Sequence, residues 1–165
     1  MVYWIIGLSG SGKTTLGKAM YEIQKLTAPN TVFIDGDDIR SHFWDHGHSM
    51  EGRKKNGDFI CKLCKWLDDQ NMNVICCILS VFKEHREWNR KNYSKYFEVY
   101  IDVPMDILQK RDVKGIYTGN KKDVIGVDIP FVVPENTDYA FINTAEKIDF
   151  KMIASFILSQ ARRKK

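Results

Sequence analysis

A short glycine-rich stretch near the start of the chain, GLSGSGKTT at residues 7–15, constrains the fold more than any other feature. It fits the pattern G-x-x-x-x-G-K-[ST], whose lysine reaches the β- and γ-phosphates of a nucleotide and whose hydroxyl ligates Mg²⁺. An apolar run precedes the loop and helical spacing follows it, which is the context that such a loop needs. The stretch therefore predicts a site for ATP or GTP with Mg²⁺. The loop residues expected to contact the nucleotide are Gly7, Ser9, Gly10, Ser11, Gly12, Lys13, Thr14 and Thr15.

Apolar runs alternate with stretches of helical spacing along the whole chain. The runs expected to form strands are VYWIIGL, TVFID, NVICCIL, FEVYIDV and YAFIN. Helices are expected after the phosphate loop, over residues 50–69, 83–91 and 104–111, and around residues 152–157. This alternation predicts an α/β fold in one domain over residues 1–165, with a five-stranded parallel sheet covered by helices on both faces.

The composition is that of an ordinary globular protein and excludes several classes of function. Hydrophobic residues make up 44% and charged residues 28% of the 165 residues, and the net charge of +4 is too small to indicate a nucleic-acid surface. No apolar stretch approaches the length of a membrane span. The first apolar run lacks a basic leader and passes directly into the phosphate loop, so we expect a cytoplasmic protein.

The four cysteines raise the question of a zinc site. Cys61 and Cys64 form a C-x-x-C pair, but their apolar neighbours at helical spacing place both thiols near a buried face. Cys76 and Cys77 are adjacent in a predicted strand, so their side chains should point to opposite faces of the sheet. That arrangement makes a site of four thiolates awkward, and core packing is the favoured interpretation over zinc.

Polar residues follow the predicted strands, and the carboxyl ends of parallel strands meet at one edge of a sheet. Gly7 follows the first strand, Asp35 and Asp37 the second, Ser80 the third and Asp102 the fourth. In FIDGDDIR, two carboxylates around a glycine can approach a metal, orient a hydroxyl acceptor and take its proton, as phosphoryl transfer requires. The plainer interpretation is a turn that caps a helix. The expected position opposite the phosphate loop favours the catalytic interpretation.

A GTP-binding switch is the alternative from a different functional class. Residues 120–123 read N-K-K-D, which matches the N-K-x-D tetrapeptide that reads guanine in GTPases. A polar segment precedes it where a buried strand should stand, and no D-x-x-G follows the third predicted strand in SVFKEHR. A lysine-rich loop is therefore the favoured interpretation of this tetrapeptide.

Beyond these features, the chain resembles the adenylylsulfate (APS) kinase family. The matching landmarks appear in order over about residues 3–144: GLSGSGKTTL, FIDGDDIR, Arg53 and Asn56 in RKKN, ILSVF, EVYIDVP, RDVKGIY and IGVDIPFVVPEN. The resemblance implies a P-loop kinase that uses ATP and Mg²⁺ to phosphorylate the ribose 3′-hydroxyl of adenosine 5′-phosphosulfate. It also implies a homodimer and a small-molecule nucleotide substrate.

The resemblance assigns roles to residues of this chain. Asp37 would orient the hydroxyl and act as the base, Asp35 and Thr14 would lie at the metal, and Lys114 would cover the transferred phosphate. Arg111 would line the ATP side. The residues implied to be catalytic are Asp37, Asp35, Lys114 and Lys13. The residues implied to hold the acceptor are Asp37, Arg40, His48, Arg53, Asn56, Ser80 and Lys114. The arginine forks suit phosphate or sulfate oxygens, and Lys114 can neutralise charge that develops in the transition state.

The chain departs from the family where the acceptor's base should bind. The family places a phenylalanine on each side of the adenine, whereas this chain has His48 and Val124 at those places. Stacking on an aromatic ring contributes about 1–3 kcal/mol per base, so the usual adenine clamp is missing. Asp38 replaces the asparagine of D-G-D-N, and the lid after KGIY is short. These departures resemble a branch of the family that phosphorylates cytidine diphosphoramidate for capsule decoration, and APS itself remains the alternative acceptor.

Overall fold

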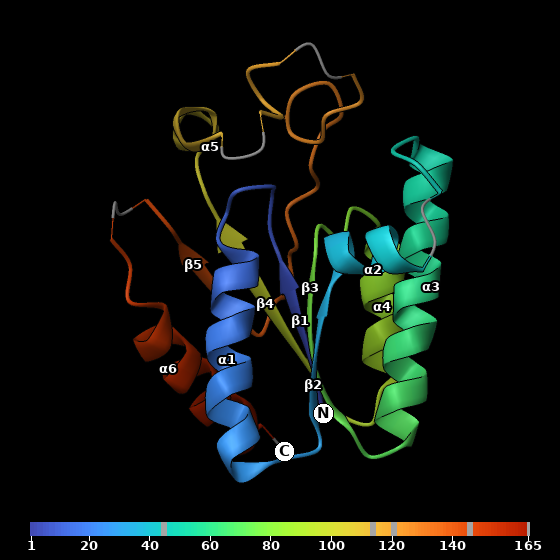
Figure 1. Ribbon diagram of the computed structural model, residues 1–165, viewed down its shortest axis with the longest axis vertical. Coiled ribbons are helices and arrows are strands. Elements are labelled where there is room, and N and C mark those ends of the chain that lie inside the picture. The colour runs from blue at the N-terminus through green and yellow to red at the C-terminus, as the bar shows by residue number, and fades with distance from the viewer. Residues whose placement is uncertain (44–45, 113–114, 120–121, 145–146, 165) are drawn as a thin grey trace.

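The computed structural model describes residues 1–43, 46–112, 115–119, 122–144 and 147–164 (Figure 1). Within these residues, five parallel strands form one sheet in the order β2-β3-β1-β4-β5. The strands are β1 (Val2–Ile6), β2 (Thr31–Asp35), β3 (Asn73–Ile78), β4 (Tyr96–Asp102) and β5 (Tyr139–Ile142). The helices are α1 (Lys13–Thr27), α2 (Gly36–His42), α3 (Met50–Asp69), α4 (Lys83–Asn92), α5 (Met105–Arg111) and α6 (Phe150–Arg163). The α/β fold predicted from the alternating pattern is confirmed.

Strand β1 lies at the centre of the sheet and is buried on both faces. Its side chains alternate between two cores. Tyr3 and Ile5 pack with residues of α1 and α6, whereas Val2, Trp4 and Ile6 pack with residues of α3. Figure 1 shows the same division, with α1 and α6 on one side of the sheet and α3 and α4 on the other. Continuous apolar strands are expected where helices cover both faces of a parallel sheet.

The cysteines belong to the cores. Cys76 packs on the α3 side of the sheet with Cys61 and Cys64, and Cys77 packs on the α1 side, as the adjacent positions in β3 predict. Burial raises the pKa of Cys61 to about 12 and also raises the pKa of Cys76, so these two thiols are protonated at neutral pH. The described residues contain no cluster of three or more side chains suited to a metal ion.

Helix α2 is an element that the sequence patterns did not predict. It begins directly after β2, where the Asp35 carboxylate accepts a hydrogen bond of 2.9 Å from the backbone N–H of Asp37. The capping interpretation of FIDGDDIR and its position at the sheet edge therefore both hold for the same residues. In the part of the chain that is described, the helices are too short or too polar to cross a membrane.

Candidate active site

The phosphate loop joins β1 to α1 and requires glycine at defined positions. Gly10 and Gly12 have positive φ angles of +77° and +101°, in the left-handed region that favours glycine. A Cβ atom at Gly12 would also lie only 2.7 Å from Cζ of Phe150. Helix α1 starts at Lys13, so the positive end of its dipole faces the loop. The Lys13 ammonium donates a hydrogen bond of 2.7 Å to the Leu8 carbonyl inside the loop.

Side chains from distant segments hold the carbonyl groups of this loop. The Tyr117 hydroxyl donates to the Ser9 carbonyl at 2.8 Å, and the Asn143 amide donates to the Ser11 carbonyl at 2.9 Å. Arg111, predicted to line the ATP side, donates weakly to both oxygens of Asn143 at 3.4 Å. Because carbonyls are tied back in this way, the loop can present its N–H groups to an anion.

The end of β2 lies against the start of α1. The Thr14 hydroxyl donates a hydrogen bond of 2.6 Å to one carboxylate oxygen of Asp35, and the other oxygen caps α2. Asp35 is buried, whereas the Asp37 side chain is half exposed and forms an ion pair with Arg40. A hydroxyl and a carboxylate are hard oxygen donors, the ligand type that Mg²⁺ takes together with water and phosphate oxygens. The donor set at Thr14 and Asp35 therefore fits Mg²⁺.

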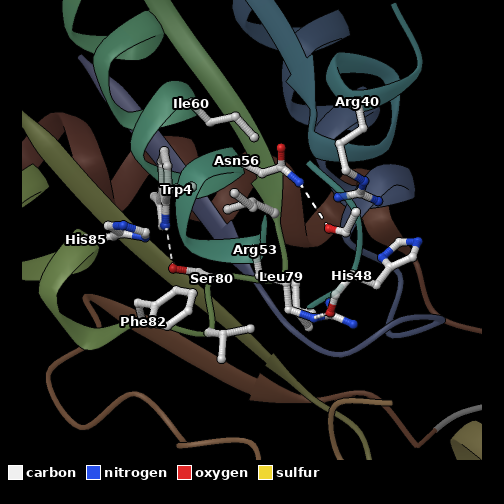
Figure 2. Close-up of a pocket in the computed structure, with 14 residues that line it drawn as sticks. Trp4, Arg40, His48, Arg53, Asn56, Ile60, Leu79, Ser80, Phe82 and His85 are labelled. Atoms are coloured by element: carbon white, nitrogen blue, oxygen red, sulfur yellow. Dashed lines mark hydrogen bonds between the residues drawn. The ribbon is translucent and has the colours of Figure 1, made fainter. Parts of the chain in front are cut away.

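A pocket, here called the acceptor pocket, opens between α2, α3 and the end of β3 (Figure 2). The structure brings into it five of the residues predicted to hold the acceptor: Arg40, His48, Arg53, Asn56 and Ser80. The remaining lining residues are Trp4, Gly47, Gly57, Ile60, Ile78, Leu79, Val81, Phe82 and His85. Asp37 is tied to its rim through the ion pair with Arg40. Lys114 lies outside the described residues.

Positive charge gathers at the mouth of this acceptor pocket. Arg53 donates to the His48 carbonyl at 2.7 Å and to the Asp123 carbonyl at 3.0 Å, which orients its guanidinium group. Burial and then the charge of Arg40 lower the pKa of Arg53. The two guanidinium groups repel one another, so an anion bound between them would be stabilised.

Asn56 organises the loop before α3. Its carbonyl oxygen accepts from the backbone N–H of His46 at 3.3 Å, and its amide donates to the Gly47 carbonyl at 3.5 Å, the contact drawn in Figure 2. This loop carries His48 at the pocket. The imidazole of His42, on α2, contacts the Ser41 hydroxyl instead. Within the described ranges, the histidines of this region form no metal cluster.

Ser80 is held in an unusual backbone conformation at the end of β3. Its φ of +51° is rare for a residue with a side chain. Its hydroxyl accepts from the Trp4 indole N–H at 3.1 Å (Figure 2), and its carbonyl accepts from Arg86 at 2.9 Å. Both partners are buried, so the position of Ser80 is fixed by the core.

The sequence patterns missed several of these supporting residues. Asn143 follows β5 directly, so the rule that polar residues gather at strand ends could have identified it. Trp4 lies in an apolar strand and His85 in a polar helix, and neither sequence pattern indicates a role at a pocket. Tyr117 is far from the phosphate loop in the sequence, and only the fold brings the two together. The guanine-reading interpretation of residues 120–123 involves Asn120 and Lys121, which are outside the described part of the chain.

Comparisons with known proteins agree with this geometry. The profile of the adenylylsulphate kinase family matches residues 1–141. The cytidine diphosphoramidate kinase of Campylobacter jejuni is 42% identical over 138 residues, which cover 81% of this chain and 81% of that protein. The adenylyl-sulfate kinase of Clostridium kluyveri is 36% identical over 148 residues, which cover 84% of this chain and 72% of that protein.

The structural comparison extends over nearly the whole chain. The solved APS kinase of Mycobacterium tuberculosis, in complex with AMPPNP and APS, has a TM-score of 0.85 and 27% sequence identity. The match covers 98% of this chain and 96% of that chain. The predicted resemblance is thus confirmed, and the chain belongs to the adenylylsulphate kinase family.

Proposed function

We propose that this kinase transfers the γ-phosphate of ATP to the ribose 3′-hydroxyl of cytidine diphosphoramidate, in the synthesis of capsule phosphoramidate. The observation that carries the proposal is the contact between Thr14 of the phosphate loop and Asp35 of the acceptor side. Because α2 follows Asp35 and brings Arg40 into the acceptor pocket, we propose that the nucleotide site and the pocket share one cleft. Transfer between two bound ligands needs such a shared cleft, because most of the rate enhancement comes from positioning and electrostatics.

On the donor side, the phosphate loop would hold ATP. Its N–H groups would bind phosphate oxygens, and Lys13 would leave the Leu8 carbonyl to reach the β- and γ-phosphates. Thr14 and Asp35 would hold Mg²⁺, whose charge offsets that of the phosphates when it is bound. Arg111, fixed beside Asn143, would line the same side.

On the acceptor side, Asp37 would orient the 3′-hydroxyl and take its proton. Its carboxylate forms an ion pair with Arg40, which holds it at the rim of the acceptor pocket. Arg40, Arg53 and Asn56 would bind the anionic 5′ group in the pocket. We propose that Lys114 neutralises the charge that develops on the transferred phosphoryl group.

The choice of cytidine diphosphoramidate rests on two observations. The Campylobacter relative that shares 42% identity acts on this compound according to its name. In this chain, His48 lines the pocket and Val124 is buried, so neither supplies the phenylalanine stacking expected for adenine. APS is the second candidate acceptor, because the Clostridium relative and the Mycobacterium structure are APS kinases.

The test is an ADP-release assay with MgATP and one acceptor at a time. We expect the highest kcat/KM with cytidine diphosphoramidate and lower values with APS and with unsubstituted nucleotides. A preference for APS would replace the proposed acceptor and leave the mechanism intact. ADP release at the same rate with no acceptor present would contradict the kinase assignment altogether.

We further propose a single domain over residues 1–165 that acts in the cytoplasm as a homodimer. Its partners would be small-molecule nucleotides, with neither nucleic acid nor a membrane involved. The modest net charge of +4 supports the first exclusion. Light scattering coupled to gel filtration measures the oligomeric state, and a mass near 19.2 kDa at assay concentrations would contradict the dimer.

A further inference from the structure

His85 of α4 lies in the acceptor pocket and has no role in the mechanism above. Its side chain is almost fully buried, and its ring packs edge-on against Phe82 with centroids 5.3 Å apart. The ring also fits against Gly57 of α3, where a Cβ atom would lie 2.4 Å from Cε1 and 2.6 Å from Nδ1 of His85. The glycine therefore provides the space that the imidazole occupies.

The hydrogen bond of His85 determines what its second nitrogen can do. Nε2 lies 2.8 Å from a carboxylate oxygen of Asp58, which is half exposed on α3. A carboxylate only accepts, so Nε2 carries the proton and, in the neutral ring, Nδ1 is left as an acceptor. Nδ1 lies beside Gly57, has no hydrogen-bond partner among the described residues, and is not sealed off from solvent. Gly57 and His85 both line the pocket.

Apart from the imidazole of His48, the other polar side chains that line the pocket are donors or already accept a hydrogen bond. Arg40 and Arg53 present guanidinium groups, which only donate. The carbonyl oxygen of Asn56 accepts a backbone N–H, and the Ser80 hydroxyl accepts the indole N–H. His85 Nδ1 therefore supplies an acceptor in surroundings that are otherwise suited to anionic oxygens.

We infer that His85 Nδ1 accepts a hydrogen bond from the amino group of the acceptor's 5′ phosphoramidate, and so selects this group over a phosphosulfate. A terminal phosphoramidate offers N–H donors, whereas a terminal sulfate offers only lone pairs, which Nδ1 would meet unfavourably. The arginines bind the oxygens of either group and cannot make this distinction. The inference rests on the proposed function and specifies the chemical group that the pocket recognises.

The H85F variant tests this role, since phenylalanine keeps a planar ring against Gly57 and Phe82 but has no nitrogen. Cytidine diphosphoramidate is compared with cytidine diphosphate at pH 8, where the diphosphate presents oxygen in place of the amino group. We expect kcat/KM to fall about tenfold for the phosphoramidate, the effect of one hydrogen bond, and to change little for the diphosphate. An equal fall for both substrates, or an unchanged ratio, would overturn the inference.

The D58N variant tests the same role without altering His85. The asparagine amide can donate to Nε2, which moves the ring proton to Nδ1 and turns the acceptor into a donor. We expect the ratio of kcat/KM for cytidine diphosphoramidate to kcat/KM for APS to fall. The matched control is D69N, which removes a carboxylate from the same helix at an exposed ion pair with Lys65, outside the pocket, and should leave the ratio unchanged. A D58N ratio equal to that of D69N would count against the inference.

The two levels of proposal fail in different ways. If the unmodified enzyme prefers APS, the proposed acceptor is wrong. If it prefers cytidine diphosphoramidate and H85F keeps the same preference, only the role of His85 is wrong. Thermal unfolding of each variant shows whether the fold is retained, and the ratio between substrates is insensitive to a loss of folded enzyme.

Discussion

At the scale of single residues, Asp37 carries the sharpest prediction. Asparagine at this position keeps the size of the side chain and the backbone N–H that donates to the capping carboxylate of Asp35, but it cannot act as a base. In the D37N variant we expect phosphoryl transfer to fall by at least about 100-fold, the usual contribution of a general base. Steady-state ADP release measures the rate.

ATP binding provides the control for D37N. The phosphate loop would bind ATP through Lys13, Thr14 and its backbone N–H groups, whereas Asp37 is proposed to act on the acceptor. Isothermal titration with a non-hydrolysable ATP analogue should therefore give nearly the same affinity as for the unmodified enzyme. Turnover that survives the substitution would remove Asp37 from its proposed role.

Individual residues could be predicted from sequence where their chemistry is tied to a spacing or a strand end. The phosphate loop and the Asp35–Asp37 pair were found in this way, and the structure places them in contact. The role proposed for His85 could not be predicted from the sequence, because the position and the tautomer of its ring depend on Gly57 and Asp58, which lie on a different helix. Trp4 is similar: nothing in a buried apolar strand indicates that its indole N–H supports Ser80.

At the scale of elements, the packing of α1 on the sheet gives a stability prediction. Gly17 of α1 passes so close to β3 and β2 that a Cβ atom would lie 2.3 Å from Sγ of Cys77 and 2.8 Å from the Phe33 ring. The G17A variant should lose about 1–3 kcal/mol of unfolding free energy through overpacking, despite the better helix propensity of alanine. Urea unfolding measures this loss. The neighbouring exposed substitution K18A should change stability little, and a G17A variant as stable as K18A would refute the argument.

The segment after α5 gives a prediction about pH. The Asp112 carboxylate accepts from the Thr118 side chain and from the N–H groups of Ile116, Tyr117 and Thr118, and these bonds lower its pKa to about 2. Because the folded-state pKa of Asp112 lies below the unfolded value of 3.8, its ionised carboxylate contributes its full stabilisation of the folded protein above pH 3.8. It is lost as the pH falls toward 2.

The D112N variant should therefore be less stable than the parent at neutral pH, and the difference should shrink between pH 3.8 and about pH 2. Urea midpoints measured across this range provide the test. The D106N variant is the control, because Asp106 is an exposed carboxylate on α5, the helix that ends beside Asp112, in a long ion pair with Lys110. A constant difference between D112N and the parent at all pH values would contradict the assignment.

Element boundaries followed from the sequence where periodicity was strong. Helix α3 spans the residues that its apolar spacing predicted, and each predicted strand is present. Helix α2 was missed because it is only two turns long and shows no apolar periodicity that a short window could detect. Pro104 precedes α5 rather than entering its first turn.

At the scale of the whole molecule, a buried ion network connects the sheet to the acceptor pocket. Glu98 of β4 is buried, and burial raises its pKa even though Arg86 and Arg90 lie 3.7 and 3.6 Å from its oxygens. Arg86 also donates to the Ser80 carbonyl, so the network reaches the site. Removing one member of a buried pair leaves a charge without compensation.

The R86M variant should therefore lose about 3–5 kcal/mol of unfolding free energy. The R86M/E98Q double variant should recover part of this loss, because the neutral amide needs no counter-charge and can still accept from Tyr96. Urea unfolding of the parent, R86M, E98Q and the double variant completes a double-mutant cycle and gives the coupling energy between Arg86 and Glu98. Additive losses would show that the arginine does not compensate Glu98.

The fold could be predicted from the sequence because two features agree: apolar runs alternate with stretches of helical spacing, and the phosphate loop stands between the first predicted strand and helix. The rule for strand ends predicted that donor and acceptor share one cleft, and the contact between Thr14 and Asp35 supports that prediction. The pocket's internal chemistry did not follow, since it is assembled from β1, α3 and α4 across large distances in the sequence. Long-range contacts of this kind leave no periodic signal.

The tethering of the phosphate loop has a consequence for how quickly a nucleotide can bind. Ordering a backbone costs roughly 1–2 kcal/mol of conformational entropy per residue. Because Tyr117 and Asn143 hold the Ser9 and Ser11 carbonyls, that entropy is lost when the chain folds rather than when the ligand arrives. Nucleotide capture thus needs no slow ordering of the loop backbone, and its observed rate should climb in proportion to ligand concentration.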